Sequence, residues 1–199
     1  MNRFSTMAAV FALAATVGLS AAARVGEPAP NFSNIDTNGK THTLGELKGK
    51  WVVLEWHNPG CEFTQKHYNS GNLPKLQKEW TAKGVVWLTV ASPSVPAERA
   101  MSLVTARGGA QTAVLMDTNA AMAKAYEAKT SPQMFVIDPK GIVVYNGAID
   151  DKPTPNVEDV AGAKNYVAAA LTEAMAGRPV TIPTSRPYGC AVTYPGATK

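Results

Sequence analysis

The chain has 199 residues, of which 45% are hydrophobic and 17% charged, and its formal net charge is +4 at pH 7. This composition is ordinary for a globular protein, and the length, less an N-terminal targeting segment, suits one domain. The basic residues are scattered and form no stripe, so the sequence gives nucleic-acid binding no support.

The first residues predict an export signal. Arg3 precedes an apolar run, Met7 to Leu19, that is too short to span a bilayer comfortably, and small residues for cleavage follow at Ser20 to Ala23. We expect residues 1–23 to be a signal peptide and the mature protein to be periplasmic or secreted, without membrane contact after cleavage. The alternative is an uncleaved anchor.

An extended, proline-rich segment opens the mature chain, and Asn38-Gly39 predicts a hairpin between two short strands. The apolar run from Trp51 to Trp56 then predicts a buried strand, and His57 to Gly60 predict a turn.

Cys61 stands between this turn and a helical pattern, at a predicted helix N-terminus. The unpaired N–H groups and dipole of a helix N-terminus favour a thiolate, so we expect a lowered thiol pKa and a reactive cysteine. Lys66 and His67, one to two turns later, would add to this effect.

Strands and helices alternate through the rest of the chain. The expected strands are Val85–Val90, Ala113–Met116, Gln133–Ile137 and Ile142–Gly147, and the expected helices are Pro74–Lys83, Pro96–Ala106, Asn119–Lys129 and Ala161–Ala176. This order predicts an α/β sheet with crossovers and a final antiparallel hairpin. We place one domain at residues 24–177 and an irregular tail, carrying the second cysteine, Cys190, at residues 178–199.

Three stretches resemble the thioredoxin-like superfamily, in its peroxiredoxin-like branch of alkyl hydroperoxide reductase and thiol-specific antioxidant proteins. VVLEWHNPGCEFT is similar to the strand, turn and helix that carry the attacking cysteine, Ser131-Pro132 to the cis-proline that faces it, and DPKGIVVYNG to the following hairpin. The resemblance implies a thioredoxin-like α/β fold: a mixed central sheet flanked by helices, with an N-terminal hairpin extension and an irregular C-terminal tail. It also implies that the Ser131 backbone pairs with an extended substrate segment.

The chain departs from two signatures of that superfamily. Thr64 stands where a disulfide reductase would carry its second cysteine, and Leu54 and Asn58 stand in two positions of the usual peroxiredoxin signature. Cys-x-x-Thr is nevertheless compatible with a one-thiol peroxidatic site. We therefore expect an antioxidant oxidoreductase in which Cys61 attacks a peroxide, with the Thr64 hydroxyl and Asn58 amide as donors.

Cys190 is the candidate resolving thiol, with a thiol reductant protein recycling the enzyme and no cofactor or metal ion. Two other functions stay open. One is thiol–disulfide exchange with partner proteins, and the other is a redox-inert binding module. In that module Cys61 and Cys190 form a permanent structural disulfide, which export favours.

Glu55 lies within an otherwise apolar strand, and its orientation stays open. Pointing inward beneath Cys61, it would be a buried carboxylate able to transfer protons; pointing outward, it would be an ordinary solvated residue. For His57 and His67 we expect exposed or hydrogen-bonded histidines rather than metal ligands, because no third ligand is evident.

Overall fold

The structure is a computed structural model that describes residues 22–194. The predicted signal peptide therefore lies almost wholly outside the described residues, as do residues 195–199, and its cleavage stays a prediction. Within the described range, no helix has both the length and the apolar character that a membrane span requires.

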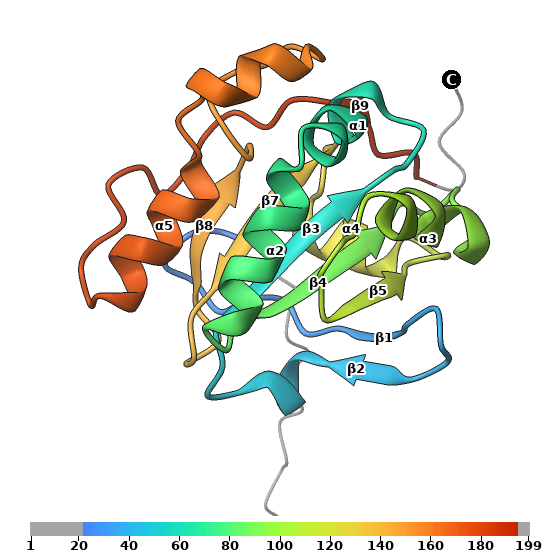
Figure 1. Cartoon of the computed structure of the whole chain (residues 1–199). Coiled ribbons are helices and arrows are strands. Elements are labelled where there is room, and N and C mark those ends of the chain that lie inside the picture. The colour runs from blue at the N-terminus through green and yellow to red at the C-terminus, as the bar shows by residue number, and fades with distance from the viewer. Residues whose placement is uncertain (1–21, 195–199) are drawn as a thin grey trace, which may run out of the picture.

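A five-stranded mixed sheet forms the centre of the molecule, in the order β5-β4-β3-β7-β8 (Figure 1). Its strands are β3 (Val52–His57), β4 (Val86–Ala91), β5 (Ala113–Met116), β7 (Gln133–Ile137) and β8 (Val143–Gly147). β3, β4 and β5 run parallel, whereas β7 pairs antiparallel with both β3 and β8. The sheet is thus the mixed α/β arrangement that the sequence predicts.

Helices cover both faces of the sheet. One face packs against α1 (Glu62–Asn69), α2 (Asn72–Ala82), α3 (Ala97–Ala106) and α5 (Tyr166–Met175). The opposite face packs against α4 (Ala121–Tyr126), the opening segment and the 3₁₀ turn η1 (Leu44–Leu47), which follows the predicted hairpin of β1 (Ser33–Ile35) and β2 (Thr41–Thr43).

β3 is buried on both of its faces. Val52, Leu54 and Trp56 point into the core on the α4 side, and Val53 points into the core beneath α2. Because side chains alternate along a strand, Glu55 and His57 share the face of Val53 and point inward.

The predicted boundaries of two helices are wrong. Instead of running from Asn119 to Lys129, α4 begins after Ala120 and ends at Tyr126, because Glu127 is left-handed. Its first N–H group donates to Asn119 Oδ1, and the next two donate to the Asp117 carboxylate. The last helix begins at Tyr166 rather than Ala161, because Asn165 caps it and a 3₁₀ turn, η2 (Val157–Gly162), fills the preceding residues.

The C-terminal tail folds back across the domain (Figure 1). From α5 it runs past β8, where the Pro183 carbonyl accepts from the Asn146 N–H at 3.1 Å, and it reaches the start of α1. There β9 (Cys190–Ala191) pairs antiparallel with β6 (Thr130–Ser131). The tail therefore brings the second cysteine to the end of the sheet where the first one lies.

Candidate active site

Cys61 and Cys190 form a disulfide bond across a sequence separation of 129 residues, with their Cα atoms 5.8 Å apart. The sequence left open whether Cys190 reaches Cys61, and the structure shows that it does. Cys61 is 1% exposed, whereas Cys190 is half-buried. The tail side of the bond is therefore the side nearer to solvent.

Cys61 is the N-cap residue of α1, as the sequence predicts. Its carbonyl oxygen accepts the Gln65 N–H at 2.9 Å, and its own N–H donates to the Asn58 carbonyl oxygen at 3.0 Å. The unpaired N–H groups of the first helical turn lie close to the N-cap side chain and favour a negative charge there. On reduction, this position would stabilise a Cys61 thiolate.

The Ser131–Pro132 peptide bond is cis, as expected, and it places the Ser131 backbone against Cys61. The Ser131 carbonyl oxygen lies 3.1 Å from Cys61 Sγ. A disulfide sulfur carries no proton, so this is a close contact here, and a Cys61 thiol could donate to the same oxygen. The Cys190 N–H donates to Cys61 Sγ at 3.2 Å and would also stabilise a thiolate.

Glu55 points into the core and is 0% exposed, which settles its orientation. Its carboxylate accepts hydrogen bonds from four side chains, namely Trp87 Nε1 at 2.8 Å, Gln77 Nε2 at 3.0 Å, Tyr68 Oη at 3.1 Å and Thr89 Oγ1 at 3.3 Å. His57 Nδ1 lies 3.5 Å from the same carboxylate. Burial, with the neighbouring Glu55 charge, raises the pKa of Tyr68 well above its usual value. The environment therefore keeps the Tyr68 phenol protonated as a donor.

His57 is not the exposed or hydrogen-bonded histidine that we expected. It is fully buried, its ring packs edge-on against Tyr68, and neither ring nitrogen has a hydrogen-bond partner among residues 22–194. No sequence pattern indicates this burial, because His57 ends an apolar strand at the position where a turn is predicted to begin. It places a titratable group beside Glu55.

Thr64 and Asn58 flank Cys61 in the chain. The Thr64 hydroxyl is fully buried and has no hydrogen-bond partner within the described part of the chain. Asn58 Oδ1 accepts from the Gly60 N–H at 2.9 Å and so holds the turn before the helix. Their roles toward a substrate stay predictions.

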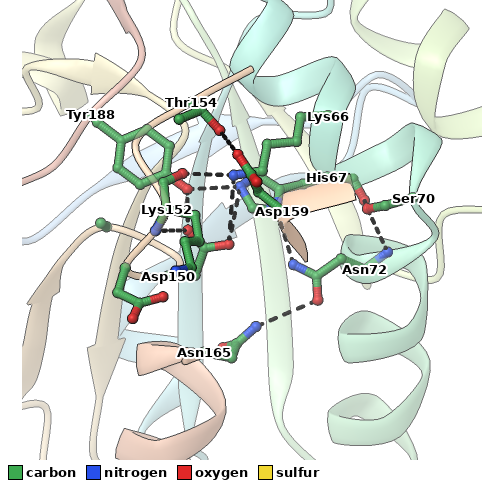
Figure 2. A network of polar contacts seen from close by, with 12 residues as sticks. Lys66, His67, Ser70, Asn72, Asp150, Lys152, Thr154, Asp159, Asn165 and Tyr188 are labelled. Atoms are coloured by element: carbon green, nitrogen blue, oxygen red, sulfur yellow. Dashed lines mark hydrogen bonds and ion pairs between the residues drawn. The ribbon is translucent and has the colours of Figure 1, made fainter. Parts of the chain in front are cut away.

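The sequence predicts that Lys66 and His67 act on Cys61, but their side chains point elsewhere. They lie with Asp150 and Tyr188 in a separate buried cluster (Figure 2). Burial and the adjacent Lys66 charge lower the pKa of His67 to about 3, which keeps the ring neutral. Sequence analysis missed Asp150 and Tyr188 because no local pattern connects positions so far apart. No three His, Cys, Asp or Glu side chains are grouped to hold a metal ion within residues 22–194.

The sequence profile described as the AhpC/TSA family matches residues 25–146. The chain belongs to the AhpC/TSA family. It is also 32% identical over 121 residues to the thiol-disulfide oxidoreductase ResA of Bacillus subtilis, in an alignment that covers 60% of this chain and 64% of ResA. The chain thus matches less than two thirds of the length of that relative.

Solved structures show that this AhpC/TSA protein has the expected thioredoxin-like fold. A hypothetical protein from Sinorhizobium meliloti superimposes with a TM-score of 0.75 at 23% identity, over 87% of this chain and 96% of that one. The thioredoxin domain of a thiol-disulfide oxidoreductase from Bacteroides vulgatus superimposes with a TM-score of 0.54 at 19% identity, over 70% and 96%. Family and fold together indicate a peroxiredoxin-like redoxin domain.

Proposed function

We propose that this protein is a thiol–disulfide oxidoreductase that exchanges a disulfide with a partner protein through Cys61 and Cys190. The observation that supports this most strongly is the double engagement of Cys190. It is bonded to Cys61 through sulfur and paired with Ser131 through its backbone. A mixed disulfide with an extended partner segment requires the same arrangement.

The exchange balances in two steps. The Cys61 thiolate attacks one sulfur of the partner's disulfide, forms a bond to it and releases the other sulfur as a thiolate, which takes up a proton. The Cys190 thiolate then attacks Cys61 Sγ, forms the Cys61–Cys190 bond and releases the partner's second thiol. The partner gains two electrons, and a thiol reductant protein later returns both cysteines to thiols.

The surrounding residues take distinct roles in this proposal. Ser131 and Pro132 present the backbone edge along which the partner segment lies. The first turn of α1 stabilises the Cys61 thiolate. Glu55 is held in the core by its four donors, with His57 as its neighbour, and its proposed role is to transfer protons to and from the thiols.

Peroxide reduction is the second candidate, and the Thr64 hydroxyl favours it. A buried hydroxyl that has no hydrogen-bond partner among residues 22–194, one turn into the helix that Cys61 caps, is available to a peroxide oxygen. Asn58 would supply a second donor. Here the Cys61 thiolate would displace water or an alcohol from the peroxide and become a sulfenic acid, which Cys190 would convert to the disulfide with loss of water.

One experiment compares the two candidates. Fully reduced protein is mixed with one equivalent of native, disulfide-bonded insulin or of hydrogen peroxide. The formation of the Cys61–Cys190 bond is followed by non-reducing mass spectrometry, with Cys61→Ser as the control. Faster closure with insulin supports exchange, and faster closure with peroxide supports the peroxidase. A bond that cannot be reduced at all would leave the redox-inert module as the function.

We also propose that the protein acts after export, in the periplasm or outside the cell. The support is the charge, length and small-residue pattern of residues 1–23. Fractionation of cells that express the full chain, with mass determination of the mature N-terminus, tests this proposal. An intact Met1 in the cytoplasmic fraction would contradict it.

A further inference from the structure

Tyr188 lies two residues before Cys190, and its side chain enters a buried polar cluster that the chemistry of Cys61 does not use (Figure 2). We call Lys66, His67 and Asp150 the Tyr188 site. The side chains of all three are at most 1% exposed. Burying three titratable groups is unfavourable unless they are paired and hydrogen-bonded, so the cluster calls for an explanation.

A directed chain of hydrogen bonds runs through this site, passes through the Tyr188 hydroxyl and ends on Asp150. Asn72 Nδ2 lies 2.9 Å from His67 Nδ1, and with the amide as donor the neutral ring carries its proton on Nε2. His67 Nε2 lies 3.1 Å from the Tyr188 hydroxyl oxygen and donates to it. The Tyr188 hydroxyl donates in turn to Asp150 Oδ1. The phenol thus joins the neutral His67 to the Asp150 carboxylate.

The ring of Tyr188 is held as well as its hydroxyl. It packs edge-on against Phe63 with centroids 5.8 Å apart, and Lys66 Nζ lies 5.5 Å from its centroid. Lys66 Nζ also donates to the Lys152 carbonyl oxygen at 2.6 Å and lies 3.8 Å from Asp150 Oδ2. Phe63, Lys66 and Asp150 therefore each contact Tyr188.

The same helix supports the site and the nucleophile. Cys61 is the N-cap of α1, and Phe63, Lys66 and His67 lie within its eight residues. A rigid helix therefore fixes the distance between Cys61 and the place where Tyr188 binds. Gly189 allows the tail to pass close to the Ser131 carbonyl oxygen, which a Cβ at this position would approach to 2.1 Å.

We propose that Tyr188 is a positioning residue for the Cys61–Cys190 couple: bound in the Tyr188 site, it holds the reduced tail so that Cys190 stays within reach of Cys61. The proposal rests on the proposed exchange function, and it names a residue that determines how readily Cys190 attacks Cys61 in the second step. Held at two points, Tyr188 and the β6–β9 pairing, Cys190 has a high effective concentration toward Cys61. A partner segment must displace the tail to reach the Ser131 edge.

The test measures the effective concentration of Cys190 directly. The full mature chain is equilibrated in glutathione buffers of varied ratio, quenched by alkylation, and the oxidised fraction is read by mass spectrometry. Tyr188→Phe removes the hydroxyl and should lower the effective concentration about tenfold, because a hydrogen bond to a charged group is lost. Tyr188→Ala also removes the ring and should lower it about a hundredfold.

Two further variants separate positioning from general damage to the fold. Asp150→Asn changes the site without altering the tail and should also lower the effective concentration. Tyr166 lines a cavity of about 540 Å³ together with Asp150 and Tyr188. Tyr166→Phe removes its hydroxyl, and the effective concentration should stay within about twofold of wild type. Iodoacetamide alkylation of Cys61 in Cys190→Ser, with and without Tyr188→Phe, checks that Cys61 itself is unchanged.

Each outcome decides the proposal. If the wild-type bond is reducible and the Tyr188 and Asp150 variants titrate within about twofold of it, the positioning role is wrong while the proposed function stands. If the wild-type bond resists glutathione and dithiothreitol, the proposed function fails. In that case reducible Tyr188 variants would still support the positioning role, and resistant ones would overturn it.

Discussion

Ser131 and Cys190 are antiparallel partners across the β6–β9 pair, so the residue before the cis-proline and the tail cysteine lie side by side at Cys61. The edge that would receive a partner's extended segment is filled by the protein's own tail. The oxidised protein therefore holds an intramolecular counterpart of the complex that exchange chemistry requires.

Replacing Cys190 by serine should convert this arrangement into a trap. Without a resolving thiol, Cys61 should stay joined to the partner after the first attack, and turnover should fall by at least about a hundredfold. Non-reducing electrophoresis of Cys190→Ser after mixing with native, disulfide-bonded insulin would show a mixed disulfide between the two proteins that dithiothreitol removes. The same adduct in Cys61→Ser would mean that the attacking residue is misassigned.

Gly189→Ala should weaken the disulfide. A Cβ at this position would lie 2.1 Å from the Ser131 carbonyl oxygen, and the φ of +130° is unfavourable for alanine. We expect the glutathione equilibrium to shift toward the dithiol by about tenfold or more, since backbone strain of this kind costs about 1–3 kcal/mol. Gly162→Ala is the matched control, because its Cβ would meet nothing within 4 Å. Equal equilibria for the two variants would contradict the close approach.

Glu55→Gln should destabilise the fold. An amide presents two donors where the carboxylate accepts from four side chains, so at least one buried donor loses its acceptor at a cost of about 1–3 kcal/mol. Urea unfolding measures this loss. Glu79→Gln, in the exposed Lys83 pair, should change stability by less than about 0.5 kcal/mol. A loss confined to activity, with stability unchanged, would mean that Glu55 acts on the reaction alone.

His67 should make the protein less stable as the pH falls. Its pKa is 6.5 in the unfolded chain and about 3 in the folded protein, so between these values only the unfolded state binds the proton. Its contribution to stability is complete above the unfolded pKa and decreases as the pH falls toward the folded value. From about pH 7 to about pH 5 the free energy of unfolding should fall by about 2 kcal/mol.

Urea titrations of wild type and His67→Gln across this pH range check the prediction. The variant should lose about 2 kcal/mol less than wild type on acidification, because glutamine does not titrate. His42→Gln is a useful comparison, since His42 contacts Asp36 at 2.9 Å in a separate part of the molecule. Parallel curves for wild type and His67→Gln would show that folding does not change the pKa of His67.

The sequence predicts the segments whose information is local. The turn and helix around Cys61, the Asn38-Gly39 hairpin and the cis bond before Pro132 follow from short patterns and from the family resemblance. Glu55 could not be oriented, because β3 is buried on both faces and so shows no alternation of polar and apolar residues.

The Tyr188 site lay beyond sequence analysis for a different reason. Its residues come from α1 and the loop after β8, and Tyr188, which enters it from the tail, is 121 residues away from His67. The path of the tail brings Tyr188 to the site, and that path is set by weak patterns of proline and glycine. Sequence patterns therefore link Lys66 and His67 to the nearest functional residue in the chain, Cys61, whereas both side chains contact Asp150 and Tyr188.

The disulfide also encloses most of the domain in one covalent ring, because it joins residues 129 positions apart. Closing a loop of this length restricts the unfolded chain and stabilises the folded state by roughly 5 kcal/mol in the chain-entropy description. By thermodynamic linkage, reduction of the Cys61–Cys190 bond therefore lowers the temperature at which the protein unfolds. The thermal midpoint of this protein thus reports its oxidation state, and more oxidising surroundings would also make the protein more resistant to unfolding.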